Sequence, residues 1–554
     1  MSIRSGNCRP RLKPYLLLFG LLLIVWVGVC AYIYIRASSE GMELKNLAGL
    51  CEKISALIVG VGLLVFGGHW AGNAYAQDIA VQKAELSAYA SQVEQNRLDE
   101  IRVYSLEIRG AGLAVGEWHQ TALWKMIKQQ NDNFRSVFSR RPEDYPPTLE
   151  SMRTVAKYAV RAVFQHSAKY AVAYWPVPTF SLAPPKRAEM TGASSMILTG
   201  RNEATLGVNL FVAERQSNTT HGQEMIEGLY SFVETNSTVP EVLIVSKDGD
   251  VVRDGQRPLG TPGLPRSGSR VPVVSESVAG LLLARSDRVD RYLRPFAVNE
   301  KENNQDTSTD LGKLWAFYWT KDRSFSDDYR KDNKGQGGDG LSTPGTMTSA
   351  YWQNQLPELE KELANRGPGN FQPSAWLPVR WAEHQIKEFD NSPLLGYLHP
   401  PVKVSMRDEN GKSLKPALQA KALQAGWLKA LEGLPNGLKP VRVFYDSTEN
   451  TDGEIALTSA LHGLNTDGHG LDLSHVEEGY DIGRRLGNTG VSSPMVQINL
   501  ATFASYLEGG VSAVVYNGAD GSMSVQMVRP PSEDAKAKSA KLRGADPFAY
   551  GMPK

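Results

Sequence analysis

Two long uncharged runs near the N-terminus constrain this chain more than any other feature of its sequence. The first, YLLLFGLLLIVWVGVCAYIYI, covers Tyr15 to Ile35, and the second, ISALIVGVGLLVFGGHWAGNAYA, covers Ile54 to Ala76. A helix rises about 1.5 Å per residue, so about 20 apolar residues cross the roughly 30 Å hydrocarbon core of a bilayer. The sequence therefore predicts a membrane anchor over residues 1–76, a transmembrane helical hairpin with helices at about 15–35 and 54–76.

The charges around these runs predict their orientation. The first run is preceded by four basic residues and no acidic residue, whereas the connection between the runs mixes both signs. Basic residues that flank membrane helices stay on the cytoplasmic side, so we expect a cytoplasmic N-terminus. A two-pass hairpin then returns the chain, and the region after Gln77 is predicted to be cytoplasmic. The four basic residues are Arg4, Arg9, Arg11 and Lys13.

A periplasmic location is the alternative. The sequence AYA at 74–76 has the small-x-small form of a signal-peptidase site after an apolar segment, although the stronger apolar run ahead of it favours the hairpin. Cys30 and Cys51 follow apolar runs as lipoprotein cysteines do. Their preceding residues, Val29 and Leu50, are not the small residues expected there, so lipidation is not predicted.

The rest of the chain has the composition of a globular protein. With 554 residues, 42% of them hydrophobic, it can fill two or three packed domains. Sixty basic and 59 acidic residues give a formal net charge of +1, which does not favour nucleic-acid binding. The three cysteines, Cys8, Cys30 and Cys51, all lie in the first tenth of the chain, which excludes an internal disulfide framework, a cysteine-based zinc site and a thiol nucleophile from the soluble part.

Alternating strand-like and helix-like segments predict an α/β, mixed α+β, fold with two mixed-sheet domains. Residues 77–100, with apolar positions at seven-residue steps, predict a linker helix. We expect a first α/β domain at 101–330 and a second at 346–529, separated by a polar, glycine-rich stretch. Residues 530–554 are expected to form a flexible, solvated tail.

Individual segments carry more specific expectations. In the first domain, strands are predicted for RVYSLEIR, LGVNLFVA, EVLIVSKDGDVV and LGKLWAFYWT, and helices for EMIEGLYSFVE and SVAGLLLAR. Within the third of these, KDGDVVRDG is expected to make a hairpin turn. In the second domain, VKVSM and VRVFYDS are predicted strands and PALQAKALQAGWLKALEGL a helix.

The stretch EIRGAGLAVGEWHQ, with glycines at 110, 112 and 116, is compatible with a phosphate-binding loop or with a tight corner between a strand and a helix. The interval from Gly112 to Gly116 is one residue too long for a dinucleotide fingerprint. The acid at the expected distance, Asp132, lies at the polar end of a predicted helix rather than at the end of a strand. The corner is therefore favoured, with the helix starting near Glu117 and burying Leu123 and Ile127.

No standard catalytic signature is found, including the G-x-S-x-G, P-loop, H-E-x-x-H and calcium-loop patterns. Six acidic and histidine residues between Asp467 and Glu478 make a metal site conceivable, but their spacing fits no known motif and favours a solvated loop. His119 is expected to cap a helix or to lie in the core. We predict no catalytic residues, no metal and no cofactor.

Aromatic residues and arginines in polar settings offer candidates for partner binding, because Trp, Tyr and Arg dominate binding hot spots. Each of them is individually more typical of ordinary packing. The candidates are Tyr174, Trp175, Arg291, Tyr292, Arg294, Trp376, Arg380 and Trp381.

Nine segments together resemble the type VI secretion lipase adaptor family of proteobacteria, over roughly residues 101–528. They are SLEIRGAGLAVGEWHQ, YWPVP, GRNEATLGVNLFV, DGDVVRDG, RSDRVDRYLRPFAV, TDLGKLWAFYW, PGTMTSAYW, WLPVRWAEHQIKEFDNSPLLGYLHPP and SPMVQINLATFASYLEGGVSA. The resemblance implies a protein that binds a phospholipase toxin in the cytoplasm and hands it to the spike protein of the secretion machine. It implies no catalytic residues.

The sequence thus predicts a non-enzymatic adaptor, anchored in the inner membrane of a Gram-negative bacterium, with a phospholipase effector and a spike protein as partners and no nucleic acid. One alternative is an immunity-type protein that sequesters the toxin at the membrane. Another is a cofactor-binding or hydrolytic enzyme that uses the glycine loop 110–116.

Overall fold

The computed structural model describes residues 12–39, 52–57, 59–61, 64, 66–72, 104–131, 134–184, 191–214, 221–257, 260–302, 306–332, 344–448, 450–544 and 546–549. The chain divides into two compact units, Met1–Gln95 and Asn96–Lys554.

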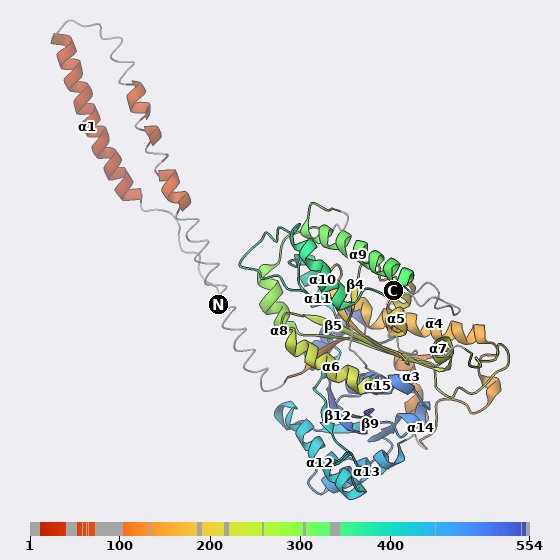
Figure 1. Cartoon of the computed structure of the whole chain (residues 1–554). Helices are drawn as coiled ribbons and strands as arrows, with labels where there is room; N and C mark the ends of the chain where they lie inside the picture. Colours follow the sequence, from red (N-terminus) through yellow and green to blue (C-terminus); the bar gives the residue numbers. More distant parts are fainter. Residues whose placement is uncertain are drawn as a thin grey trace. The chain divides into compact units, whose positions relative to one another are not determined.

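The N-terminal unit contains helix α1 (Leu12–Ser39), which covers the first predicted span. Among the described residues, one helix, Glu52–Gly72, is long and apolar enough to cross a membrane by its length and composition, and α1 contains a shorter apolar helix, Gly20–Arg36. The two helices lie side by side (Figure 1). The Trp26 indole Nε1–H donates to Ser55 Oγ at 2.9 Å and so joins them. A membrane-spanning hairpin stays a proposal, and the predicted linker helix at 77–100 lies outside the described residues.

The second unit is built on one mixed sheet of twelve strands. Ten strands follow one another in the order β10–β9–β11–β12–β7–β1–β6–β5–β3–β4, while β2 pairs only with β1 and β8 only with β12. The strands are β1 (Leu106–Val115), β2 (Trp118–His119), β3 (Pro176–Leu182), β4 (Leu210–Glu214), β5 (Glu241–Asp248), β6 (Ser277–Ala284), β7 (Gly396–Leu398), β8 (Val402–Val404), β9 (Pro440–Tyr445), β10 (Gly479–Asp481), β11 (Val511–Asn517) and β12 (Met523–Arg529).

The sheet consists of two halves with the same strand order. From the centre outwards, one half runs β1–β6–β5–β3–β4 and the other β7–β12–β11–β9–β10. In each half the first two pairings are antiparallel and the last two parallel, and an antiparallel pairing of β1 with β7 joins the halves. These halves lie in the two predicted segments 101–330 and 346–529. The division into separate domains stays a prediction, since the strands form a single sheet.

Helices form three layers around the strands of the two halves. Helices α4 and α5 pack on the outer face of the first half, and α12 and α13 on the outer face of the second. Between the halves lie α6 and α15, together with α3 (Figure 1). The bounds are α3 (Gln120–Gln129), α4 (Leu149–His166), α5 (Thr191–Glu203), α6 (Gly222–Thr235), α12 (Pro416–Glu432), α13 (Thr451–Asn465) and α15 (Ser493–Glu508).

The remaining helices connect these layers or lie beside them. They are α7 (Asp250–Gln256), α8 (Ser286–Arg288), the π-helical turn η4 (Val289–Leu293), the 3₁₀ turn η5 (Arg294–Phe296), α9 (Asp310–Asp332), α10 (Ser349–Glu360), α11 (Glu383–Asn391), α14 (Ile482–Leu486) and α16 (Glu533–Arg543), with short 3₁₀ turns at η2 (Pro142–Asp144), η3 (Ala168–Tyr170), η6 (Pro435–Gly437) and η7 (Gly490–Ser492).

Helix α15 is buried on all sides. Every residue from Ser493 to Tyr506 is buried, and the helix contacts strands of both halves. Its sequence, SPMVQINLATFASYLE, has no charged residue before its last position, as expected of a helix without a solvent-facing side. Two of its polar side chains bond within the helix: Thr502 Oγ1 donates to the Ile498 carbonyl at 2.8 Å, and Asn499 Nδ2 donates to the Met495 carbonyl at 2.9 Å.

The glycine motif lies mostly inside a strand. Gly110 and Gly112 belong to β1, where an added Cβ would lie 2.5 Å from the Ser167 carbonyl oxygen and 2.3 Å from that of Val163. Only Gly116, with φ +57°, occupies a turn, between β1 and β2. The predicted corner is therefore confined to Gly116, and the helix starts at Gln120 rather than near Glu117, with Leu123 and Ile127 buried as predicted.

Three predicted elements are wrong for identifiable reasons. SVAGLLLAR forms strand β6, not a helix, because it lies between β1 and β5 with both faces buried, where a strand also reads as an unbroken apolar run. LGKLWAFYWT begins helix α9, not a strand, and buries Leu311, Leu314 and Tyr318 at helical spacing. KDGDVVRDG makes no hairpin: Gly249, with φ +148°, ends β5 and leads into α7.

Much of the predicted C-terminal tail is folded. Residues 533–543 form α16, and Phe548 is 1% exposed. The Phe548 ring centroid lies 4.7 Å from that of Phe503 and 5.2 Å from that of Tyr506, near the end of α15. Asp546 accepts a hydrogen bond from Thr121 Oγ1 at 3.0 Å, which fixes the segment against α3.

Candidate functional site

Five of the eight predicted partner-binding residues lie in the core. Tyr174, Trp175, Trp376, Arg380 and Trp381 are 1–8% exposed. Trp175 and Trp381 contact each other edge to face with 5.7 Å between ring centroids, and Arg380 donates to the carbonyls of Asn365, Phe296 and Pro368. Partner binding by these five residues stays a prediction, but their side chains are not presented at the surface.

The other three predicted residues lie together on one surface segment. Arg291 is exposed and Tyr292 and Arg294 are half-buried, on the turns η4 and η5 that follow α8. The Arg291 guanidinium lies 5.3 Å from the centroid of the Tyr292 ring, within the range of a cation–π contact. A π-helical turn is rare and is frequent at functional sites. With Asp290 and Asp390, these residues are named here the arginine–tyrosine surface.

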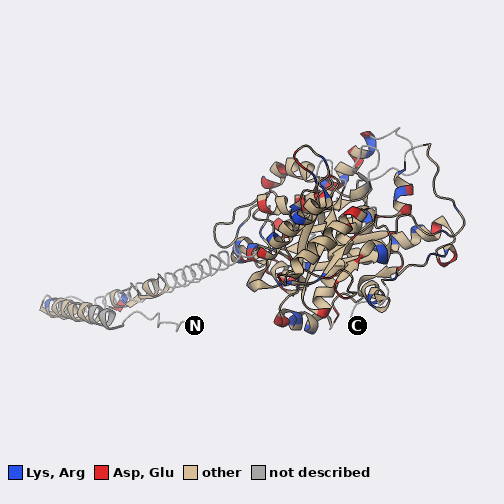
Figure 2. Cartoon of the chain, turned by 90° about the horizontal axis from the view of Figure 1, so that it is seen from below, with Lys and Arg blue, Asp and Glu red and all other residues tan. Residues whose placement is uncertain are grey.

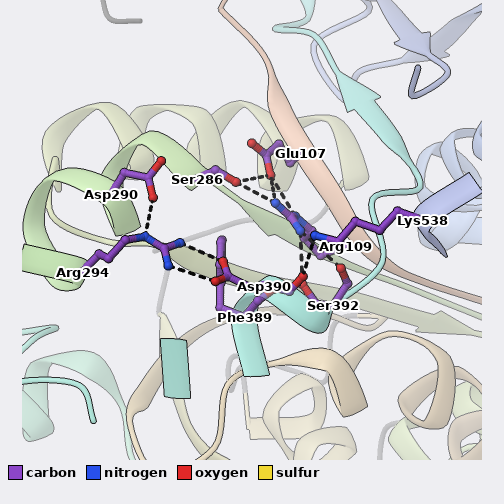
Figure 3. A network of polar contacts seen from close by, with 9 residues as sticks. All are labelled: Glu107, Arg109, Ser286, Asp290, Arg294, Phe389, Asp390, Ser392 and Lys538. Carbon is purple, nitrogen blue, oxygen red and sulfur yellow. Dashed lines mark hydrogen bonds and ion pairs between the residues drawn. The ribbon is translucent and has the colours of Figure 1, made fainter. Parts of the chain in front are cut away.

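Arg294 is held by two carboxylates of this surface (Figure 3). Its Nη1 and Nη2 donate to the two Asp390 carboxylate oxygens at 2.9 and 2.8 Å, and its Nε donates to Asp290 at 2.9 Å. Hydrogen bonds from Arg294 to Asp390 raise the pKa of the guanidinium, which therefore stays charged. A bidentate pair of this kind fixes side-chain orientation more than it stabilises the fold, because exposed ion pairs contribute little.

A buried arginine, Arg109, lies beside this surface (Figure 3). Arg109, on β1, donates to Glu107, to Ser286 Oγ at 2.6 Å and to the Ser392 carbonyl at 3.3 Å, and it lies 4.9 Å from the centroid of the Phe389 ring. Ser286 belongs to α8 and Ser392 follows α11. The network thus fixes β1, the start of the η4 segment and the end of α11 relative to one another.

Two further carboxyl groups, of the buried Glu241 and the half-buried Glu388, accept backbone hydrogen bonds. Glu241 accepts the Val172 N–H at 3.1 Å, and Glu388 accepts the Ala173 N–H at 3.1 Å. Burial raises the pKa of Glu241 to about 8 and also raises that of Glu388. Their hydrogen bonds hold the chain that leads into β3, which indicates a structural role.

A polar cavity of about 550 Å³ lies where the N-termini of α6, α13 and α15 meet. Its wall includes Arg253, Arg407, Asp446, Asn450 and Ser493. Asp446 accepts hydrogen bonds from Ser493 Oγ and from the Thr448 N–H at 2.8 Å, and burial raises its pKa. Serine and aspartate are therefore paired with each other at this site.

The acidic and histidine-rich loop forms local pairs. Glu477 pairs with Lys128, His475 lies 3.4 Å from Glu478, and Asp472 accepts a hydrogen bond from Ser474 at 2.7 Å. Among the described residues, no three histidine, cysteine or acidic side chains are placed to hold a metal ion. His119 precedes α3 without capping it through its side chain, and burial lowers its pKa.

Basic and acidic residues are interspersed over the described part of the folded unit (Figure 2), in keeping with the nearly balanced charge of the chain.

The sequence alone did not single out Glu107, Arg109 and Asp390 as site residues. One signal was available, since LEIR places a charge at alternate positions of a predicted strand.

Comparison with known proteins identifies the family. Residues 104–267 match the family described as Type VI lipase adapter protein Tla3, N-terminal, and residues 395–530 match its C-terminal counterpart. The two matches together cover more than half of the chain. The chain belongs to the Tla3 family of type VI lipase adaptors. The first match starts just before β1 and ends after β5, so it covers the first half of the sheet except β6, and the second match covers β7 to β12, all strands of the second half.

Solved structures similar to this member of the Tla3 family include an ishigamide ketosynthase/chain length factor, with 11% identity, a TM-score of 0.37 and coverage of 77% of this chain and 100% of that chain. Another is a ketosynthase from module 1 of the bacillaene synthase from Bacillus amyloliquefaciens FZB42, with 10% identity, a TM-score of 0.37 and coverage of 77% and 76%. Scores this low carry no argument about fold or activity.

Proposed function

We propose that this protein is a membrane-anchored, non-enzymatic adaptor that binds a phospholipase effector of a type VI secretion system in the cytoplasm and helps to load it onto the spike protein. The observation that carries the proposal is the match of both halves to the type VI lipase adapter family. The family description supports an effector partner. Membrane anchoring, the cytoplasmic side and the spike are the finer parts of the proposal.

The arginine–tyrosine surface is the proposed contact with the effector. Arginine and tyrosine are enriched at binding hot spots because they combine a large contact area with hydrogen bonding. Arg294 is held in place by two carboxylates, and Arg291 remains exposed beside Tyr292. A surface that is ordered before binding loses less conformational entropy when a partner docks.

Pull-down of the effector by the full chain tests this assignment. Replacing Arg291 and Tyr292 together by alanine is expected to weaken capture by at least about tenfold, the loss typical of hot-spot residues. The control is the double variant Tyr158→Ala and Arg161→Ala, an exposed tyrosine and arginine on α4. Equal capture by the two double variants would place the contact elsewhere on the protein.

The membrane part of the proposal is tested separately. Among the described residues, the helix Glu52–Gly72 is long and apolar enough to cross a membrane, and its Ser55 accepts a hydrogen bond from Trp26 of α1. These two observations support an anchor in the N-terminal unit. Tethering an adaptor near the secretion machine raises its local concentration. Deletion of residues 1–76 is therefore expected to reduce toxin delivery without abolishing effector capture, and unchanged delivery would exclude a role for the anchor.

The immunity-type alternative differs in location. A topology reporter fused after Lys554 is expected to be active only in the cytoplasm if the protein is a loading adaptor. Activity confined to the periplasm would favour toxin sequestration instead. An enzyme that uses the glycines 110–116 is disfavoured by geometry, because backbone atoms of Val163 in α4 and of Ser167, which follows α4, already occupy the space beside Gly112 and Gly110.

A further inference from the structure

A second cavity, of about 320 Å³, lies beside the turn at Gly116. Its wall is formed by the β1–β2 turn, residues 137–146, the first turns of α4 and the segment before β6. Most of the wall is apolar, with Trp118, Phe138, Tyr145, Met152, Val155 and Pro272 as its main side chains. A cavity of this volume, apolar with a few polar groups, is typical of sites for small organic ligands.

One basic side chain of this wall lacks a full set of acceptors. Arg270 Nη2 donates to the Pro265 carbonyl at 3.0 Å and approaches Met152 Sδ at 3.7 Å, neither of which is a carboxylate. Its Nε atom is buried and has no hydrogen-bond partner among the residues that the structure describes. A buried N–H without an acceptor is costly, and more so on a charged group. The Arg270 guanidinium thus lines the cavity without a carboxylate partner among the described residues, and its charge is available to an anionic ligand.

The acidic groups of the wall do not neutralise Arg270. Asp250 accepts the backbone N–H groups of Val273 and Val274 at 2.8 and 3.0 Å, and Asp144 is ion-paired with Arg141 at 2.9 Å. Burial raises the pKa of Glu276 to about 8, so this side chain is mostly neutral at pH 7. The remaining acid, Glu117, is exposed.

We propose that this cavity binds an apolar carboxylate, with the apolar group against Trp118, Phe138 and Met152 and the carboxylate paired with the Arg270 guanidinium. An aromatic or hydrocarbon body matches the wall, and a single negative charge matches the guanidinium of Arg270, whose described partners are not carboxylates. This chemistry is offered by a small carboxylic acid and by the carboxyl end of a polypeptide with an apolar last residue. The proposal does not depend on the adaptor function.

The test is isothermal titration calorimetry of the full chain in lipid nanodiscs with three small probes. Phenylbutyrate has both parts of the predicted ligand, phenylbutanol lacks the charge and acetate lacks the apolar body. Among these three probes, only phenylbutyrate is expected to give a heat of binding to the protein. Partition of the probe into the lipid also gives heat, but this background is the same for the wild type and for the variants described below. Two peptides ending in phenylalanine, one with a free carboxyl end and one amidated, form a second arm. Binding of the free peptide but not of phenylbutyrate would support the site with a polypeptide end as its ligand.

Variants locate the binding. Arg270→Gln is expected to weaken phenylbutyrate binding by at least about tenfold, the loss expected for a hydrogen bond to a charged group. Arg266→Gln, at an exposed arginine four residues earlier, is the matched control and is expected to bind as the wild type does. Val155→Trp fills the cavity and is expected to abolish binding, with thermal unfolding of each variant as the check on folding. The proposal is overturned if Arg270→Gln binds phenylbutyrate as tightly as the wild type does, or if phenylbutanol binds as well as phenylbutyrate. It is also overturned if neither phenylbutyrate nor the peptide with a free carboxyl end binds.

Discussion

At the scale of single residues, glycine determines how closely helix α4 approaches the central strand. Gly112 of β1 pairs with Gly280 of β6, and both lie under the end of α4 near Val163. Gln120, with φ +53°, supplies hydrogen bonds to the edge of β1. Its side-chain amide donates to the Ala111 carbonyl and accepts the Leu113 N–H. The glycine-rich stretch therefore serves packing and backbone hydrogen bonding.

Gly112→Val tests this packing role. The new Cβ would lie 2.3 Å from the Val163 carbonyl oxygen, so strand and helix must separate. We expect the free energy of unfolding to fall by at least about 2 kcal/mol. Overpacking a core costs about 1–3 kcal/mol of stability, and here the obstructing atoms belong to the backbone, which moves less readily than a side chain. Urea unfolding followed by circular dichroism measures this. Gly207→Val, where an added Cβ meets nothing within 4 Å, is the control, and an equal loss in both variants would refute the packing role.

Glu241 predicts a pH dependence of stability. Its pKa is about 8 in the folded state because of burial, against an ordinary value of 4.5, so the folded protein holds this proton more tightly than the unfolded chain. The resulting stability is fully present below about pH 4.5 and is lost as pH rises through about 8, by up to ~1.4 kcal/mol per pH unit in between.

Glu241→Gln removes this titration and keeps an oxygen that can accept the Val172 N–H. The variant is expected to gain stability relative to the wild type as pH rises from 5 to 8, measured by urea unfolding at each pH. Glu409→Gln, at an exposed glutamate, is expected to follow the wild type throughout. A constant difference between Glu241→Gln and wild type across this range would contradict the assignment.

At the scale of elements, local sequence patterns predicted several strands and helices correctly. Strands at Leu210–Glu214 and Pro440–Tyr445 and helices at Gly222–Thr235 and Pro416–Glu432 are confirmed. Periodicity failed for β6, which is buried on both faces, and for the start of α9, whose aromatic residues resemble a strand in composition. In both cases the local sequence does not decide between strand and helix, because the outcome depends on which neighbouring elements cover the segment in the folded protein.

The same reason limits prediction of the site. Tryptophan, tyrosine and arginine suggest a binding surface by residue type, but type does not distinguish a hot spot from a core aromatic. Trp175 and Trp381 pack against each other in the core, whereas Arg291 and Tyr292 lie on a turn at the surface. Asp390 orients Arg294 from 96 residues away in sequence, a partnership that no local pattern contains.

The C-terminal element makes a further prediction. Phe548 inserts between Phe503 and Tyr506, so the segment after α16 holds the exposed end of α15. Phe548→Ala is expected to destabilise the protein by about 2–3 kcal/mol, below the 3–5 kcal/mol of a central Phe→Ala change because the segment can detach. Thermal unfolding and faster hydrogen exchange in α16 report this. Leu542→Ala removes a half-exposed apolar side chain of α16 itself and should change neither.

At the scale of the whole molecule, the two halves repeat one strand order but share their interior. Each half has its own outer pair of helices, whereas α6 of the first half and α15 of the second lie together between the strands of both. The inner face of the first half is thus covered by a helix encoded some 200 residues later. Two folded halves with one common central layer differ physically from two domains joined by a linker.

Separate expression of the halves distinguishes these descriptions. A fragment ending at Asp332 lacks α15 and would expose apolar residues of β1 and β6, the strands on which α15 packs, such as Leu113, Ala279 and Leu281. Exposed apolar surfaces of this size drive aggregation, so this fragment and one starting at Pro344 are each expected to be insoluble or poorly folded alone. Co-expression is expected to yield a soluble complex, detected by size-exclusion chromatography and cooperative thermal unfolding. If either fragment folds cooperatively by itself, it contains an independent domain, and the division predicted from the sequence at 330–346 is correct for that half.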